Sequence, residues 1–532
     1  MSEAIVENGD HIIIPQSSTQ NLREEEDIQE NDIPMEQLTA FQKTKKFIMT
    51  LAGFVGPGFM VAVGYLDPGN WATDLAAGSQ YGYLLLFIIL LSNLMAVLLQ
   101  SMCVRLGVVK GLDLAQLCRR VFPRWAYLIL YVLTELAIMA TDLAEVIGSA
   151  IALKLLFKIP MFWGVLVTAA DVMMILFAWK PENFRYFEFL IFGLVFTCAI
   201  CLFIVTGKSN PVFSDVMYGF LPKWDIITAP GALYVSVGII GATVMPHNLY
   251  LHSSIVQQRS GFKANHAEEV NEVSSNGDAN SLIRETDTQL VSRLRNIPTF
   301  LQMSWLDSAI ALTFALFVNA SILIISSANF YTIGRTDIAE IPDAFNLIGE
   351  LLGSAFATVF ATALLISGQS STITGTMAGQ IIMEGFLGGE IKIQPWVRRL
   401  VTRLLAITPP LICIVWFGEN RLNDLLILSQ IVLSLQLPFA VWPLIYFTSS
   451  KQFMTVTFVN DEAEWNGNEL ANEEHSNIFA NEDELVELDN PPQEIVKCFA
   501  NHTITTVLAV IVGLLLTIFN VILLVQVATG NT

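Results

Sequence analysis

Charged side chains are scarce in this chain of 532 residues: only 14% are Asp, Glu, Lys or Arg, whereas 53% are hydrophobic. The mean hydropathy is +0.56. A soluble globule of this size could not cover its surface with so few charges without exposing very large apolar patches. The composition therefore excludes an ordinary soluble domain and predicts a polytopic membrane protein.

Other signatures are missing as well. The first 40 residues are polar and acidic, without a charged segment followed by an apolar core, so we expect no cleavable signal peptide. The six cysteines lie mostly in apolar segments, which argues against a disulfide framework. We find no nucleotide loop, zinc-ligand spacing or nucleophile elbow. We therefore expect neither an enzyme nor a nucleic-acid partner, and no cofactor.

The chain is instead rich in apolar stretches of about 20 residues, the length that crosses a hydrocarbon core. Their number predicts eleven spans. They lie at about residues 49–77, 82–104, 126–150, 160–179, 187–206, 231–256, 303–327, 352–375, 400–417, 425–448 and 503–527.

The distribution of Lys and Arg predicts how these spans are oriented. If the N-terminus is cytoplasmic, 22 of the 28 basic residues fall on cytoplasmic segments, as the positive-inside rule requires. We expect a multi-pass protein of the plasma membrane or of an endosomal or vacuolar membrane, in contact with the lipid bilayer. Its N-terminus is predicted to be cytoplasmic and its C-terminus extracytoplasmic.

Much of the formal net charge of −20 lies in two polar tracts, Glu24 to Glu36 and Asp461 to Asp489. Few apolar residues and many acids are typical of disorder. We predict a disordered acidic cytoplasmic N-terminus (1–44), a transporter core (45–450), a mostly disordered acidic cytoplasmic loop (451–500), and a last span with a short extracytoplasmic tail (501–532). A linker from about Gly261 to Arg295 is also expected to be flexible.

Two of the apolar spans are interrupted by a proline, in Asp67-Pro68-Gly69-Asn70 and in Met245-Pro246-His247-Asn248. Proline lacks a backbone donor and clashes with the preceding turn, so each span should unwind there and leave carbonyl groups unpaired. The two interrupted spans are the first and the sixth. Because each half would then hold five crossings, we predict a 5+5 inverted repeat with broken helices 1 and 6, and an eleventh span outside the repeat.

Asp67 is the strongest candidate site residue, because a carboxylate in the middle of a span persists chiefly where it faces a cavity, a partner or an ion. The Asn70 side chain and a freed carbonyl near Gly64 could face the same cation. The alternative is that Asp67 caps the outer half-helix. Both interpretations can hold together.

Met245 is the candidate that bears on selectivity. With Pro246 in place, the Ala242 carbonyl has no helical partner, so this carbonyl and the Met245 thioether could face one ion. A thioether contributes little to Mg²⁺ or Ca²⁺, whereas Mn²⁺, Fe²⁺ and later transition ions tolerate it. The alternative is that Met245 only fills space.

A row of titratable residues predicts a proton route. Glu135, Asp142 and Glu145 share one helical face, and acids along a membrane helix are typical of a proton relay or of an ion pathway. His247 and His252 can titrate near neutral pH. Arg398, Arg399 and Arg403 are candidate counterparts of the acids, although Arg398 and Arg399 alternatively serve only as positive-inside anchors.

Polar residues of other spans are further candidates for the site or its surroundings. Gln430 must find a hydrogen bond or meet substrate, and it reaches the ion only if its span closes over the site. Asn319 and Thr243 are expected to tether neighbouring helices around the site.

These motifs, together with Met139-Ala140-Thr141-Asp142-Leu143-Ala144-Glu145 and the run from Gly368 to Thr376, resemble the Nramp family of proton-coupled divalent metal transporters. The resemblance covers about residues 45–450 and the last span. It implies an all-α LeuT-type fold and import of Mn²⁺ and Fe²⁺ into the cytosol with protons. The functional unit is expected to be a monomer.

The resemblance also implies site residues. The implied metal ligands are Asp67, Asn70, Met245 and the Ala242 carbonyl, joined by Gln430 and the Gly64 carbonyl in the occluded state. The implied proton route runs through Asp67, His247, Glu145 and Asp142 to Glu135 and to Arg398, Arg399 and Arg403. Family branches that handle Mg²⁺ or Al³⁺ lose the methionine, so Met245 argues against those substrates.

Two other functions remain open on the sequence alone. An ion-coupled organic solute symporter shares this architecture, although its site would favour small residues and bare helix N-termini over an Asp and a Met. A transporter-like metal sensor is the other alternative, but it would be expected to carry a large soluble output domain.

Overall fold

The computed structural model describes residues 64–178, 184–260, 287–334, 340–388, 395–460 and 493–529. All of them belong to one compact unit, Val55–Thr532. The predicted N-terminal segment 1–44 and the centre of the predicted acidic loop lie outside the described residues.

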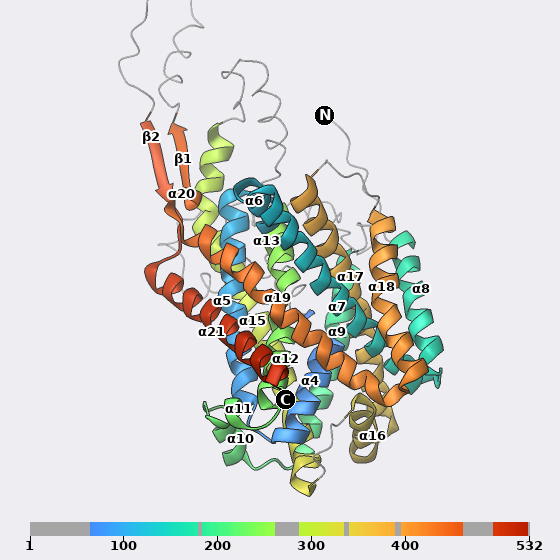
Figure 1. Ribbon diagram of the computed structural model, residues 1–532. Helices are drawn as coiled ribbons and strands as arrows, with labels where there is room; N and C mark the ends of the chain where they lie inside the picture. Colours follow the sequence, from blue (N-terminus) through green and yellow to red (C-terminus); the bar gives the residue numbers. More distant parts are fainter. Residues whose placement is uncertain are drawn as a thin grey trace, which may run out of the picture. The chain divides into compact units, whose positions relative to one another are not determined.

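Helices make up nearly all of the described chain (Figure 1). The long helices are α5 (Leu86–Lys110), α7 (Arg124–Phe157), α8 (Met161–Ala178), α9 (Phe184–Lys208), α15 (Asp287–Asn329), α17 (Ser354–Leu387), α18 (Pro395–Trp416), α19 (Leu422–Ser449) and α21 (Thr503–Thr529). The two interrupted spans supply α4 (Pro68–Tyr81), α12 (Ala232–Thr243) and α13 (Pro246–Ser260). The short helices are α6 (Leu114–Val121), α10 (Phe213–Gly219), α11 (Asp225–Thr228), η2 (Tyr331–Ile333), α16 (Ile341–Leu352), η4 (Glu419–Arg421) and α20 (Lys451–Met454).

Each of the eleven predicted ranges contains helix. Within the described residues, seven helical stretches are long and apolar enough to cross a membrane: α5, α7, the pair α12 and α13, α15, α17, α19 and α21. Shorter apolar stretches lie in α8, α9 and α18. The exact number of crossings stays a prediction.

Two segments predicted as loops contain regular structure. Strands β1 (Thr455–Asn460) and β2 (Gln493–Cys498) pair antiparallel, with Thr455 opposite Cys498, so the two ends of the predicted loop 451–500 form a ribbon. The predicted linker is also shorter than expected, because residues 287–295 already belong to α15. The acidic tract between the two strands dominates the composition of the predicted loop and hid the short strands at its ends.

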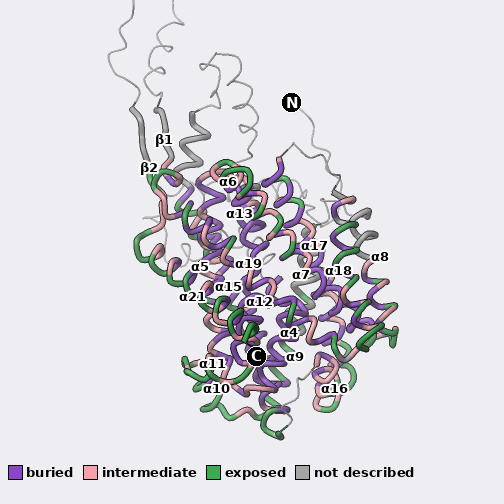
Figure 2. The backbone as a smooth tube through the Cα atoms, viewed as in Figure 1, coloured by how far each residue is buried: buried purple, intermediate pink, exposed green. Residues whose placement is uncertain are grey.

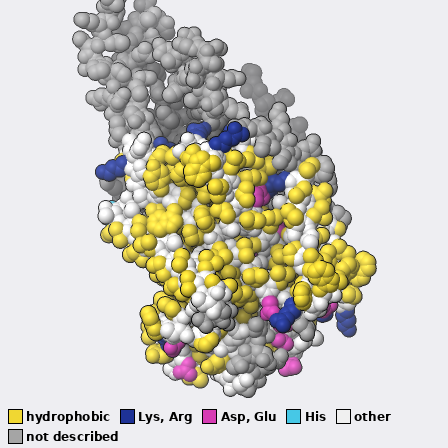
Figure 3. Space-filling model, in the orientation of Figure 1, with side chains coloured by type: hydrophobic (Ala, Val, Ile, Leu, Met, Phe, Trp, Pro, Cys, Tyr) yellow, Lys and Arg dark blue, Asp and Glu magenta, His cyan; other side chains and the backbone are white. Residues whose placement is uncertain are grey.

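One face of most helices of this unit is buried in the interior of the bundle, as the buried residues in Figure 2 show. On the face drawn in Figure 3, hydrophobic side chains form a broad band, and charged side chains gather toward its two ends. We call these the α6 end, which also carries α20 and the two strands, and the α10 end, which also carries α11 and α16 (Figure 1). An apolar belt between charged ends is the surface that a bilayer requires.

The interior helices place the candidate residues around the two breaks. Helix α4 packs against α15 and α12, and α12 packs against α19. Helix α7 packs against α17, α18 and α19. The acids of α7 and the two broken helices therefore lie in the same buried part of the bundle.

Candidate functional site

The first break lies immediately before Pro68. Tyr65, Leu66 and Asp67 are not helical, and α4 begins at Pro68. Proline suits this position because the first residue of a helix needs no backbone donor. The predicted unwinding is confirmed, but it involves residues 65–67 rather than Pro68-Gly69, both of which are helical.

Asp67 caps α4 and is completely buried. Its Oδ1 accepts hydrogen bonds from the Asn70 backbone N–H at 2.9 Å and from Asn70 Nδ2 at 2.7 Å. Its Oδ2 has no hydrogen-bond partner in the described part of the chain. The capping interpretation is therefore correct.

The carbonyl groups freed by the first break are held by side chains of other helices. Asn319 Nδ2 donates to the Tyr65 carbonyl at 3.3 Å, and Ser367 Oγ donates to the Leu66 carbonyl at 2.6 Å. Asn319 acts as the expected tether, whereas Ser367 was not predicted. Helices α15 and α17 thus fix the backbone on either side of Asp67.

The second break comprises Val244 and Met245, between the end of α12 and the start of α13 at Pro246. Since Pro246 has no N–H, the Ala242 carbonyl lacks its helical donor. Asn70 Nδ2 donates to this carbonyl instead, at 3.1 Å. The Asn70 side-chain amide therefore contacts two other predicted ligands, the Asp67 carboxylate and the Ala242 carbonyl.

Met245 is buried beside the same break. Its Sδ accepts a hydrogen bond from Asn248 Nδ2 at 3.6 Å. A β-carbon at Gly64 would lie 3.1 Å from the same Asn248 nitrogen, so the Asn248 amide lies between Gly64 and Met245. No separate role was predicted for Asn248, although it belongs to the second proline motif.

Gln430 reaches the start of α4 from α19. A β-carbon at Gly69 would lie 2.1 Å from Gln430 Nε2, which means that the glutamine amide rests directly on Gly69. Its Oε1 is buried and has no hydrogen-bond partner among the described residues. The span that carries Gln430 therefore closes over the first turn of α4, which was the condition for its role.

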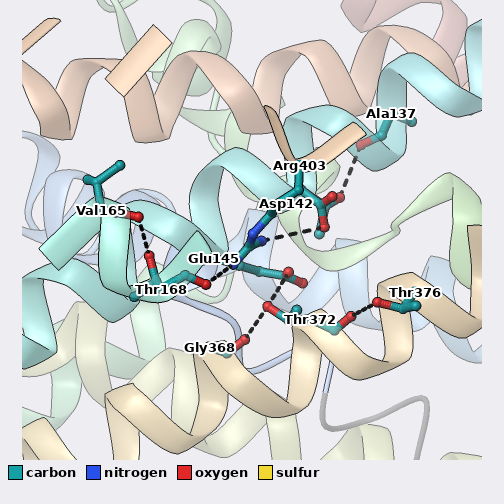
Figure 4. Close-up of polar contacts among 10 residues, drawn as sticks. Ala137, Asp142, Glu145, Val165, Thr168, Gly368, Thr372, Thr376 and Arg403 are labelled. Carbon is teal, nitrogen blue, oxygen red and sulfur yellow. Dashed lines mark hydrogen bonds and ion pairs between the residues drawn. The ribbon is translucent and has the colours of Figure 1, made fainter. Parts of the chain in front are cut away.

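The acids of α7 form a separate polar cluster with α17, α8 and α18 (Figure 4). Thr372 Oγ1 donates to Glu145 Oε2 at 2.6 Å. Arg403 Nη1 lies 3.9 Å from Asp142 Oδ1, and its Nη2 donates to the Thr168 carbonyl at 3.0 Å. Arg403 is thus the counterpart of Asp142.

Glycines of α17 make room for this cluster. A β-carbon at Gly375 would lie 3.7 Å from Glu145 Oε1 and 3.9 Å from Asp142 Oδ1. One turn further, a β-carbon at Gly379 would lie 2.2 Å from Arg398 Nη2. Both acids and the Arg398 guanidinium therefore pack against the backbone of α17 at Gly375 and Gly379.

Arg398 forms a two-point ion pair with Glu135. Its Nε and Nη2 donate to the two carboxylate oxygens at 2.9 and 2.7 Å, and the side chains are only 7% and 14% exposed. Arg398 is therefore more than a positive-inside anchor. The side chain of Arg399 lies outside what the structure describes.

His247 is buried at the start of α13, and Asp142 acts on it electrostatically. His252, one turn and a half further, bonds through Nδ1 with Gln100 Oε1 at 2.6 Å, and Gln100 Nε2 donates to the Tyr65 hydroxyl at 3.0 Å. This bridge joins α13, α5 and the first break. Gln100 was missed because a lone Gln in an apolar helix carries no spacing signal.

The arrangement differs from a conventional metal cluster. Among the described residues, no group of three or more His, Cys, Asp or Glu side chains could hold a metal ion. The donors gathered at the two breaks are one carboxylate, amides, a backbone carbonyl and a thioether. Such a mixed set suits a borderline transition ion that must be bound and then released.

Comparison with known proteins gives a consistent result. The family model described as natural resistance-associated macrophage protein-like matches residues 58–465. A divalent metal cation transporter MntH of Nostoc sp. is 50% identical over 418 residues, which cover 78% of this chain and 87% of the relative. The MntH protein of Listeria innocua is 49% identical over 422 residues, which cover 79% and 87%.

A solved structure is similar as well. The Eremococcus coleocola manganese transporter, crystallised with an aromatic bis-isothiourea compound, has a TM-score of 0.68 and 36% identity and covers 91% of this chain and 87% of its own. The predicted all-α membrane fold is confirmed, and the LeuT-type 5+5 repeat stays a prediction.

Proposed function

This chain belongs to the natural resistance-associated macrophage protein-like (Nramp) family, and from that membership we propose that it imports divalent transition metal ions, Mn²⁺ and Fe²⁺ among them, into the cytosol together with protons. It is a secondary transporter and not an enzyme. Alternating access, in which one bundle of helices rocks against the other, delivers the ion.

The observation that carries the proposal is the hydrogen bonding of the Asn70 amide to both Asp67 Oδ1 and the Ala242 carbonyl. These groups come from two different broken helices. An ion held between them would be released when one half of the chain moves relative to the other. Met245, at the second break, adds the soft ligand that disfavours Mg²⁺ and Ca²⁺.

Proton coupling follows from the need for a deprotonated ligand. A carboxyl must give up its proton before it binds a metal ion, so metal binding at Asp67 releases a proton into a buried site. His247, Glu145 and Asp142 supply the groups that accept it, and Arg403 and the pair of Arg398 with Glu135 continue the route. Arg399 is retained in this route on the family resemblance alone.

We further propose that the α6 end faces the cytosol and that the functional unit is a monomer in the bilayer. The positive-inside rule supports the orientation, since Arg105, Lys110, Arg119, Arg120 and Arg124 flank α6 or lie in it.

Manganese uptake by Asp67→Ala tests the proposal. The variant is expected to lose transport at acid pH, whereas Asp424→Ala, which removes an exposed carboxylate paired with Arg421, should transport as the wild type does. Surface expression is measured for all three proteins. The assignment fails if Asp67→Ala, present at the surface, moves Mn²⁺ at the wild-type rate.

A further inference from the structure

Asp74 is a buried carboxylate that neither the ligand set nor the proton route uses. The residue is 1% exposed, and neither of its carboxylate oxygens has a hydrogen-bond partner within the described residues. Burying a carboxylate without a partner is strongly unfavourable. Inside a membrane helix, such a group persists chiefly where it meets a cation or a proton.

The position of Asp74 links it to the metal site. Asp74 follows Asp67, the N-cap of α4, by seven residues. Seven residues are nearly two helical turns, so the two residues lie on one side of α4, about 10 Å apart along its axis. The two carboxyls are close enough to interact electrostatically. Tyr81, at the end of α4, donates its hydroxyl to the Pro230 carbonyl beside α11 at 2.9 Å. Asp74 therefore lies between Asp67 and the α10 end, from which the ion would enter.

The face of α4 that carries Asp74 packs closely on α15. One turn before Asp74, Asn319 Nδ2 lies 3.5 Å from Asn70 Oδ1, and one turn after it, a β-carbon at Gly78 would lie 2.3 Å from the Leu323 carbonyl oxygen. Helical side chains lean toward the N-terminus, so the Asp74 carboxylate leans toward the level of Asn319. Asn319 Oδ1 is also buried without a hydrogen-bond partner in the described part of the chain.

We propose that Asp74 and Asn319 Oδ1 form an entry site that holds one divalent cation before it reaches Asp67. The inference rests on the proposed function and extends it to a second site. Its donors are oxygen atoms only, so the entry site accepts Mn²⁺ and Ca²⁺ alike. Discrimination between these ions is left to Met245.

Two cation sites in series affect the rate of transport through the repulsion between their ions. An ion at Asp74 repels an ion at Asp67, and such repulsion between adjacent sites speeds release from the second one. The entry site therefore raises the rate at which metal is delivered without setting which metal is selected.

Binding of Mn²⁺ alone to the purified full-length protein, followed by the electron paramagnetic resonance signal of free Mn²⁺, tests the inference. Asp67→Asn should keep a weak Mn²⁺ site that Ca²⁺ displaces. Asp67→Asn/Asp74→Asn should weaken that site at least tenfold, whereas Asp67→Asn/Asp424→Asn should keep it. Absence of the weak site from Asp67→Asn, or equal binding by Asp67→Asn and Asp67→Asn/Asp74→Asn, would overturn the inference.

The proposed function fails separately, if Asp67→Asn binds and transports Mn²⁺ as the wild type does. Thermal unfolding and gel filtration check that each variant is folded, and Asp74→Ser replaces Asp74→Asn if the latter is not. In transport, Asp74→Asn is expected to raise the KM for Mn²⁺ about tenfold and to leave the preference for Mn²⁺ over Ca²⁺ unchanged. A changed preference would contradict a nonselective entry site.

Discussion

Asn70 donates a side-chain N–H to the carbonyl oxygen of Ala242 at 3.1 Å, and this bond joins the start of α4 to the end of α12. The carbonyl is free to accept because Pro246, four residues further, has no N–H. The proline of one broken helix thus prepares a backbone acceptor for the amide of the other. A movement of one broken helix relative to the other would therefore strain or break this hydrogen bond.

Replacing Asn70 by Ala should therefore weaken metal binding more than the loss of the Asn70 donor atom alone would. The variant loses a donor atom and also the contact that positions Asp67 and the Ala242 carbonyl, so we expect Mn²⁺ affinity to fall on the order of 10- to 100-fold. Calorimetric titration measures it. Asn329→Ala, which removes a half-buried amide near the α10 end, is the control, and equal affinities of the two variants would contradict the bridging role.

The contact between α12 and α19 predicts a stability effect. A β-carbon at Gly241 would lie 2.0 Å from the Gln430 carbonyl oxygen and 2.7 Å from the Ser434 backbone nitrogen. Because backbone atoms cannot turn aside, Gly241→Ala should force the helices apart and destabilise the protein by about 1–3 kcal/mol. Thermal unfolding in detergent measures the change.

Gly193→Ala is the matched control for Gly241→Ala. A β-carbon at this position of α9 would meet no atom of the described residues within 4 Å. Since alanine favours a helix over glycine, this variant should be as stable as the wild type or slightly more so. Equal destabilisation of both variants would contradict the close-contact argument.

The pair of Arg398 and Glu135 should behave as a buried unit. Arg398→Ala leaves the Glu135 carboxylate buried without its partner and is expected to destabilise the protein by about 3–5 kcal/mol. Arg398→Leu/Glu135→Gln removes both charges and should be less destabilised than Arg398→Ala. Chemical unfolding of the two variants checks the order, and a double variant as unstable as Arg398→Ala would show that the charges do not act as a pair.

A pH effect on stability is expected at the α6 end. Asp113 caps α6 by accepting from the Gln116 backbone N–H at 2.8 Å, and burial raises its pKa from 3.8 to about 7. Between these two values the folded state holds a proton that the unfolded chain has released. The folded state therefore loses stability as pH rises from about 4 to about 7.

Asp113→Asn removes this titration and keeps a side-chain oxygen that can cap the helix. The unfolding midpoint of the variant should consequently rise relative to the wild type between pH 5 and pH 8. Melting curves of both proteins at the two pH values measure the difference. A difference independent of pH would rule out Asp113 as its source.

The breaks and the shared face of the α7 acids could be predicted because both depend on short sequence spacing. Pro68 and Pro246 identify the breaks, and offsets of seven and three place Glu135, Asp142 and Glu145 together. The position of the first break was less accurate, since Pro68 starts the next helix instead of ending the unwound part. Whether Pro68 starts a helix or ends the unwound segment depends on the hydrogen bond by which the Asp67 side chain caps α4 at Asn70.

Contacts between distant segments could not be predicted. Thr372 reaches Glu145 across 227 residues, and nothing local distinguishes this Thr from others in α17. Gly69, Gly375 and Gly379 matter only because Gln430, the α7 acids and Arg398 lie against them. Choosing between Arg398 and Arg403 as partners of Glu135 and Asp142 likewise required the packing of α18 against α7.

X-ray absorption spectroscopy of Mn²⁺ bound to the purified protein tests the central claim most directly, because it reports which elements surround the ion. We predict a shell of oxygen atoms together with one sulfur atom, and loss of the sulfur in Met245→Ala with the oxygen atoms retained. A shell without sulfur in the wild-type protein, or one that Met245→Ala leaves unchanged, would contradict a site built from both broken helices.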